Sequence, residues 1–144
     1  MRSDAEWGVF LGEVLGRFGC QTGTLHFTDG SGESLDLVTQ VGVPEGLVEK
    51  IRVIPFGKGI AGAAAVQREP VEMCNLQTDT SGVARPDAKQ TGVVGSLAVP
   101  IFSADGERVL GTLGIGKYVP YDFTAEEKSA VGEIAAGIGK EIES

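Results

Sequence analysis

The clearest chemical pattern in the chain runs from residue 57 to residue 62 and reads Gly-Lys-Gly-Ile-Ala-Gly. In a strand–turn–helix unit, this G-x-G-x-x-G spacing brings backbone amides at a helix start close to the pyrophosphate of a dinucleotide. Here Pro55 lies near the end of the preceding apolar run, and proline lacks the N–H that a central strand must donate. Glu69-Pro70 cuts short the helix that could follow, so it cannot serve as the crossover of a parallel sheet. The pattern therefore favours a tight, closely packed turn over a nucleotide site.

Side chains suited to covalent catalysis are few. His26 is the only histidine, so a Ser-His or Cys-His pair would have to use it. Cys20 and Cys74 are the only cysteines, and their separation matches no zinc-ligand spacing. We interpret them as two reduced thiols, while a disulfide between them stays open. No active site is assembled by these residues, and His26 fits a structural role on a strand at least as well as a binding role.

The composition is that of one globular domain spanning residues 1–144. The formal net charge of −8 repels phosphate backbones and anionic lipid headgroups, which disfavours nucleic acid and membrane surfaces as partners. No apolar run reaches the length of a membrane span, and the N-terminal residues lack the pattern of a signal peptide. We therefore expect a cytoplasmic protein.

Two amphipathic helices are predicted at the ends of the chain. Residues 3–18 open with Ser3 and Glu6 in capping-box spacing, and residues 124–142 open with Thr124 and Glu127 in the same spacing. Both segments carry apolar residues three and four positions apart, which is typical of a helix with one buried face. In the first helix three glycines recur every fourth residue, and we expect the sheet or a partner helix to approach them closely: Gly8, Gly12 and Gly16.

Between the helices, two hairpins are predicted. Residues 22–27 and 35–41 flank an Asp-Gly-Ser-Gly turn, and residues 96–102 and 108–118 flank a turn that contains Asp-Gly. Side chains alternate across a strand, so one face of three of these strands is bulky and apolar. The opposite face carries small or mildly polar residues, which are Thr24, His26, Thr28, Ser96, Ala98, Pro100, Thr112, Gly114 and Gly116.

The terminal helices match the bulky face, so residues 42–95 are left to cover the small-residue face. A space between that face and this cover is a reasonable site for a small molecule. The alternative is that the cover packs directly on the small residues and fills the space. Within the cover, Arg85 and Asp87 flank a proline, and an arginine can hold a carboxylate or phosphate through two hydrogen bonds. A solvated loop is the simpler interpretation of these two residues.

Several motifs follow one another in a fixed order: the 56–62 turn, Glu69-Pro70-Val71, a long loop with Arg85, the strands 95–101 and 109–113, and Phe123-Thr124-Ala125-Glu126-Glu127. This order resembles that of a GAF domain over residues 3–142. The resemblance implies an α+β, PAS-related fold with a central antiparallel sheet of five or six strands, terminal helices on one face and a ligand pocket on the other. Family members bind cyclic nucleotides, bilins, haem, amino acids or other small molecules, and many are input modules of signalling proteins.

The chain departs from three functional groups of that family. It has no convincing equivalent of the Asn-Lys, Phe and Asp-Glu set of cyclic-nucleotide binders. Cys74 is not followed by the Cys-His pair that bilin attachment would suggest. Free methionine-sulfoxide reductases of the family rely on cysteines in the loop before the second hairpin, and residues 75–95 contain none.

We therefore predict a sensory or regulatory domain that binds an unidentified small molecule and forms a homodimer through its terminal helices. A dimerisation or protein-interaction module without a ligand is the alternative, and a redox enzyme that uses Cys74 is a less favoured one. The residues predicted to line the ligand site are His26, Phe56, Ile60, Ala61, Cys74, Arg85, Asp87, Ser96, Ala98, Thr112 and Gly114.

Overall fold

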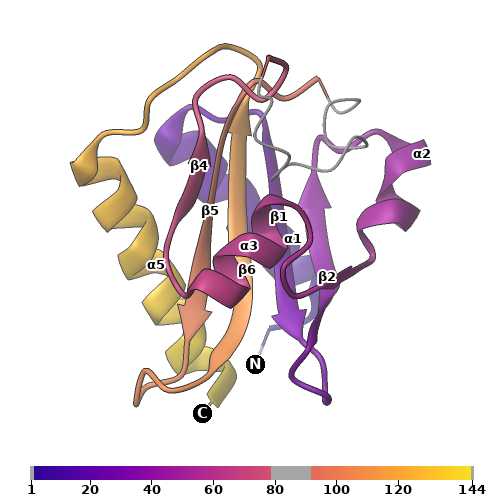
Figure 1. Ribbon diagram of the computed structural model, residues 1–144, viewed down its shortest axis with the longest axis vertical. Helices are drawn as coiled ribbons and strands as arrows, with labels where there is room; N and C mark the ends of the chain where they lie inside the picture. The colour runs from indigo at the N-terminus through magenta and orange to yellow at the C-terminus, as the bar shows by residue number, and fades with distance from the viewer. Residues whose placement is uncertain (1, 79–91, 144) are drawn as a thin grey trace.

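The fold is an α+β arrangement of one antiparallel sheet with helices on both faces (Figure 1). A computed structural model describes residues 2–78 and 92–143. The helical elements are α1 Asp4–Phe18, α2 Glu45–Val48, the 3-10 turn η1 Glu49–Ile51, α3 Gly59–Gln67 and α5 Ala125–Glu143. The strands are β1 Thr22–Thr28, β2 Ser34–Val41, β3 Val53–Pro55, β4 Val71–Met73, β5 Gly95–Phe102 and β6 Val109–Lys117. None of the helices within the described residues is both long and apolar enough to cross a membrane.

The sheet has six strands in the order β3-β2-β1-β6-β5-β4. The two predicted hairpins, β1–β2 and β5–β6, form the four inner strands, and β1 pairs with β6 between them. Segment 42–95 contributes both edge strands, because β3 pairs with β2 and β4 pairs with β5. The antiparallel sheet confirms that the G-x-G-x-x-G pattern does not open a parallel βαβ unit.

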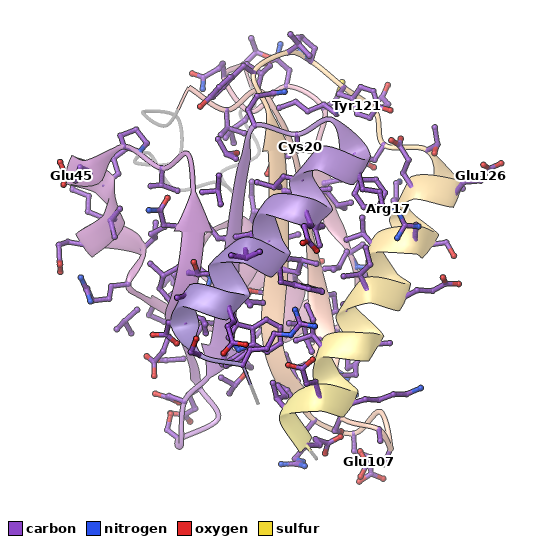
Figure 2. The ribbon with its side chains drawn as sticks, turned by 180° about the vertical axis from the view of Figure 1, so that it is seen from behind. Arg17, Cys20, Glu45, Glu107, Tyr121 and Glu126 are labelled. Carbon is purple, nitrogen blue, oxygen red and sulfur yellow. The ribbon has the colours of Figure 1, made fainter. Side chains whose placement is uncertain are left out.

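The main hydrophobic core lies between the bulky face of the sheet and the two terminal helices. Figure 2 shows α1 and α5 side by side on this face. Trp7 packs edge-on against Phe10 and Phe27, with ring centroids 5.6 Å apart in both pairs. The predicted distribution of faces is confirmed, since the buried core contains Leu11, Leu25, Leu97, Val99, Ile101, Leu113, Ile115, Val131 and Ile138.

Both predicted capping boxes are present. The amide of Glu6 donates to Ser3 Oγ at 3.2 Å, and the amide of Ser3 donates to Glu6 Oε1 at 3.1 Å. At the start of α5, the corresponding bonds between Thr124 and Glu127 measure 3.0 and 2.9 Å. These bonds satisfy backbone N–H groups that have no partner within the helix, and so they fix where each terminal helix begins.

A β-bulge in β2 changes which of its side chains lie on each face. Leu25 pairs with Thr39, but His26 pairs with Leu37, so the register skips one residue of β2. Leu35, opposite Thr28, therefore lies on the same face as His26. There it forms a second buried cluster with Ile54 and Ala65. Bulky side chains of β2 and β3 therefore fill this part of the face, and the small side chains lie on β5 and β6.

The glycines of α1 only partly meet the expectation of a close neighbour. A Cβ atom on Gly8 would lie 3.3 Å from Thr39 Oγ1, which is a tight contact with the sheet. Cβ atoms on Gly12 and Gly16 would meet nothing within 4 Å, and both residues are exposed. Of the two neighbours that the sequence left open, the sheet of the same chain therefore approaches only Gly8, and a partner helix at Gly12 and Gly16 stays a prediction.

Two glycines of α5 provide a matched test of this packing. A Cβ on Gly139 would collide with the backbone carbonyl of Phe102, whereas a Cβ on Gly137 would enter open space. Gly139→Ala should therefore lower the free energy of unfolding by about 1–3 kcal/mol because β5 or α5 must shift. Gly137→Ala should raise it by up to about 1 kcal/mol through helix propensity. Urea denaturation of both variants measures the two effects. Equal effects of the same sign would contradict the close approach of α5 to β5.

Candidate functional site

A pocket of about 150 Å³ lies on the small-residue face, near the end of the sheet where β1 begins. The pairing of the strands places its floor in two rows. Thr22, Gly116 and Ser96 lie across β1, β6 and β5 in one row. Thr24, Gly114 and Ala98 lie across the same strands in the next row. All six residues line the pocket.

The walls of the pocket come from the segment between the two hairpins. Ile60 and Ala61 contribute from the first turn of α3, and Val43 and Ile51 from the connection between β2 and β3. Leu76 and Val93 lie at the two sides of the undescribed residues 79–91. The described part of segment 42–95 thus covers the small-residue face as the sequence predicts, and a hollow stays between this cover and the sheet.

The floor depends on two glycines. A Cβ on Gly116 would lie 2.5 Å from Thr22 Oγ1 and 2.8 Å from a methyl carbon of Val93. A Cβ on Gly114 would lie 2.8 Å from Thr24 Oγ1. Real Cβ atoms do not approach so closely, so any other residue would have to displace these side chains. The absence of a side chain at both positions leaves the hydroxyls of Thr22 and Thr24 beside bare backbone at the floor.

The G-x-G-x-x-G turn fixes α3 at the edge of the pocket. Gly57 has a φ of 89°, in the left-handed region that favours glycine, and its amide donates to the carbonyl of Gly62 at 2.8 Å. A Cβ on Gly62 would lie 2.7 Å from the carbonyl oxygen of Pro55. The turn therefore needs glycine for close packing. This packing sets where Ile60 and Ala61 stand above the sheet.

Further along the face, α3 closes directly on the sheet. His26 and Thr112 form a cross-strand pair, one row beyond Thr24 and Gly114, and each is only 1% exposed. Neither lines the pocket. Three consecutive alanines of α3 are buried, and their small side chains let the helix pack closely: Ala63, Ala64 and Ala65. The two alternatives left open by the sequence thus hold at different places on one face. The cover fills the region over His26 and leaves a hollow over Ala98.

His26 connects the sheet to the pocket wall. Its Nε2 lies 2.9 Å from the carbonyl oxygen of Ile51. A carbonyl can only accept, so Nε2 carries the proton and Nδ1 is left as an acceptor in the neutral ring. Within the part of the chain that the structure describes, Nδ1 is buried without a hydrogen-bond partner, as is the hydroxyl of Thr112. Burial lowers the pKa of His26, while the bond to Ile51 and the charge of Asp36 act in the opposite direction with less effect.

Two further predicted site residues, Phe56 and Cys74, lie away from the pocket. Phe56 packs at the second cluster with Leu35 and Ile54, and it borders a wider hollow of about 940 Å³ at the opposite end of the sheet. Cys74 is exposed and does not line the pocket, and an interaction with the carboxylate of Asp122 raises its pKa. Arg85 and Asp87 lie outside the described residues. The pocket therefore brings together five of the predicted residues, namely Ile60, Ala61, Ser96, Ala98 and Gly114.

Several lining residues were not predicted. Thr22, Thr24 and Gly116 follow from the same strand alternation that identified Ser96 and Ala98, so the signal was present in the sequence. Val43 and Ile51 lie in a connection with no regular periodicity, and no sequence signal places them over the sheet. Within residues 2–78 and 92–143, no three His, Cys, Asp or Glu side chains gather closely enough to hold a metal ion.

The fold and the pocket define an α+β domain with a covered sheet face, and the comparisons identify its family. The family model described as "GAF domain" matches residues 9–143, so the chain belongs to the GAF domain family. No curated protein sequence matches the chain.

Solved structures agree on the fold. The GAF domain of a phosphoenolpyruvate-protein phosphotransferase from Coxiella burnetii is 20% identical with a TM-score of 0.80, covering 97% of this chain and 82% of that one. A free methionine-R-sulfoxide reductase from Neisseria meningitidis, solved with its substrate, is 21% identical with a TM-score of 0.79, covering 97% and 77%. A domain of a two-component sensor histidine kinase protein from Sinorhizobium meliloti is 16% identical with a TM-score of 0.75, covering 99% and 92%. The same fold thus occurs in domains of a phosphotransferase and of a sensor histidine kinase protein, and in a reductase.

The buried imidazole gives the protein a defined dependence on pH. In the unfolded chain His26 has an ordinary pKa near ~6.5, and burial lowers it in the folded protein. Below that pH the unfolded chain binds a proton that the folded protein resists, so stability falls as pH falls. The loss is at most about 1.4 kcal/mol per pH unit.

His26→Gln tests this dependence, because glutamine offers an uncharged N–H to Ile51 and does not titrate. Urea denaturation at pH 7 and pH 5.5 should show a larger loss of stability in the natural protein than in the variant. Carboxylates titrate in both proteins, so their contribution cancels in the comparison. An equal loss in the two proteins would contradict the burial of a neutral histidine.

Proposed function

We propose that this GAF domain is a sensory or regulatory module that binds a small molecule in the pocket above Ser96 and Ala98. The observation that carries this proposal is the hollow itself. Ala98 is 3% exposed, and yet it lines an open volume beneath α3. The sheet is covered there without being filled, which is the usual condition of a ligand site. Relatives from a phosphotransferase and a sensor histidine kinase support a regulatory context.

We also propose that the protein is located in the cytoplasm. Cys20 and Cys74 are both free thiols, which is usual in a reducing compartment. The formal charge of −8 also supports a partner other than nucleic acid or a membrane surface.

The relatives that are reductases favour a second candidate, a redox enzyme that uses Cys74. Two observations weigh against it. The raised pKa of Cys74 disfavours the thiolate, which is the nucleophilic form. Cys74 is also absent from the pocket lining, so a molecule bound over Ala98 would not lie against it. We therefore prefer binding over catalysis.

A substitution that fills the pocket should abolish ligand binding. Ala98→Phe places a ring in the hollow, so a metabolite that raises the melting temperature of the natural protein should leave the variant unshifted. Val66→Phe is the matched control, because Val66 is 56% exposed on α3 and borders the hollow at the other end of the sheet. A panel of metabolites in a thermal-shift assay provides the measurement. A shift that persists in Ala98→Phe would place the ligand elsewhere.

We further propose that the terminal helices form a homodimer. The exposed surface of α1 contains Gly12, Gly16 and Val9, the last 66% exposed, and glycines without a neighbour allow another helix to approach closely. Gly12→Leu should then convert a dimer to a monomer. Gly46→Leu, at an exposed glycine of α2 that also faces open space, should leave the mass unchanged. Light scattering measures both variants, and a dimer that survives Gly12→Leu would contradict a contact at this position.

A further inference from the structure

The described lining of the pocket carries no charged side chain. Its residues are Thr22, Gly23, Thr24, Val43, Ile51, Ile60, Ala61, Leu76, Val93, Ser96, Leu97, Ala98, Gly114, Ile115 and Gly116. Among these described lining residues most side chains are aliphatic, and the only polar side chains are those of Thr22, Thr24 and Ser96. All three arise from the floor.

These hydroxyls are available to a ligand. None of them makes a side-chain hydrogen bond within the described part of the chain. The buried, unpartnered polar atoms of that part are on other residues: His26, Asn75 and Thr112. Thr22 and Ser96 stand on either side of Gly116, and Thr24 stands beside Gly114, so the hydroxyls gather over bare backbone. A hydroxyl can donate or accept, which suits an uncharged polar group on a ligand.

The size of the pocket limits the ligand further. An apolar cavity of about 150 Å³ holds a molecule the size of benzene. The volume here is about 150 Å³, with one polar side. A haem or a bilin is larger than the volume that the described residues enclose.

We propose that the ligand is a small uncharged molecule with an apolar body and a single hydrogen-bonding group directed at the floor hydroxyls. This inference rests on the proposed binding function. Moving a charge into an aliphatic pocket without a countercharge is unfavourable, whereas a hydroxyl or carbonyl keeps a hydrogen bond to Thr22, Thr24 or Ser96.

Matched probes test the inference on the whole chain. Benzyl alcohol, benzoate and protonated benzylamine share one ring and differ in charge. Titrations followed by amide NMR shifts should show benzyl alcohol binding at least about tenfold more tightly than either ion. Ala98→Phe should remove the binding, and Val66→Phe should retain it.

Thr24→Val tests the polar contact with little change in shape. It should weaken benzyl alcohol binding by about two- to tenfold while leaving benzene binding unchanged, because one hydrogen bond is lost. Thr39→Val is the matched control, since Thr39 lies on the opposite face, near Gly8. If Ala98→Phe fails to fold, the comparison of Thr24→Val with Thr39→Val still tests whether the ligand binds at the floor of the pocket.

The outcomes separate this inference from the proposed function. If benzoate or benzylamine binds as tightly as benzyl alcohol and Ala98→Phe removes it, the pocket binds ligands but the uncharged class is wrong. If benzoate binds most tightly and Arg85→Ala removes this preference, Arg85 supplies a positive charge to the ligand site. This outcome would also show that the uncharged class is wrong. If no probe binds at millimolar concentration, or if Ala98→Phe has no effect, both the inference and the proposed function are contradicted.

Discussion

The absence of side chains at Gly114 and Gly116, on the central strand β6, is the constraint on which the pocket depends. On the opposite face of the same strand, Leu113 and Ile115 are buried under the terminal helices. The sheet therefore has one bulky face that forms the core with the terminal helices, and one small-residue face whose side chains are too small to fill a second core. Threonines of the neighbouring strand already occupy the space where a Cβ would project. Any cover over this face must either come very close or leave a hollow.

Helix α3 packs closely on one part of this face and leaves a hollow over another part, and its sequence explains the difference. Its buried alanines let it pack on β5 and β6, and His26 and Thr112 are fully buried on the same face of the sheet. At its first turn Ile60 and Ala61 stand over a gap, because the glycine turn before it sets the height of the helix. The bond from His26 to Ile51 attaches another wall residue to the sheet. The closely packed half of the face thus positions the walls of the hollow half.

Much of this arrangement could be predicted from the sequence, because it follows from local rules. The capping-box residues predicted where the terminal helices begin, and the turn residues predicted the two hairpins. The alternation of side chains placed Ala98 and Gly114 on the small-residue face. The rest depends on tertiary contacts. The bulge that brings Leu35 beside Ile54 leaves no local signature, and the β2–β3 connection gives no sign that Val43 and Ile51 form a wall. By strand alternation, His26 and Thr112 lie on the same face of the sheet as the residues that form the floor of the pocket. Only the tertiary packing of the cover shows that these two residues are buried outside the pocket.

Diffraction from crystals under xenon pressure tests the central claim most directly, because xenon enters apolar cavities of about this size. If a hollow lies between the small-residue face and α3, we expect a xenon atom above Ala98 and Gly114, with Ile60 and Leu76 around it. A map in which side chains of the cover fill that volume, with no xenon there, would contradict the account.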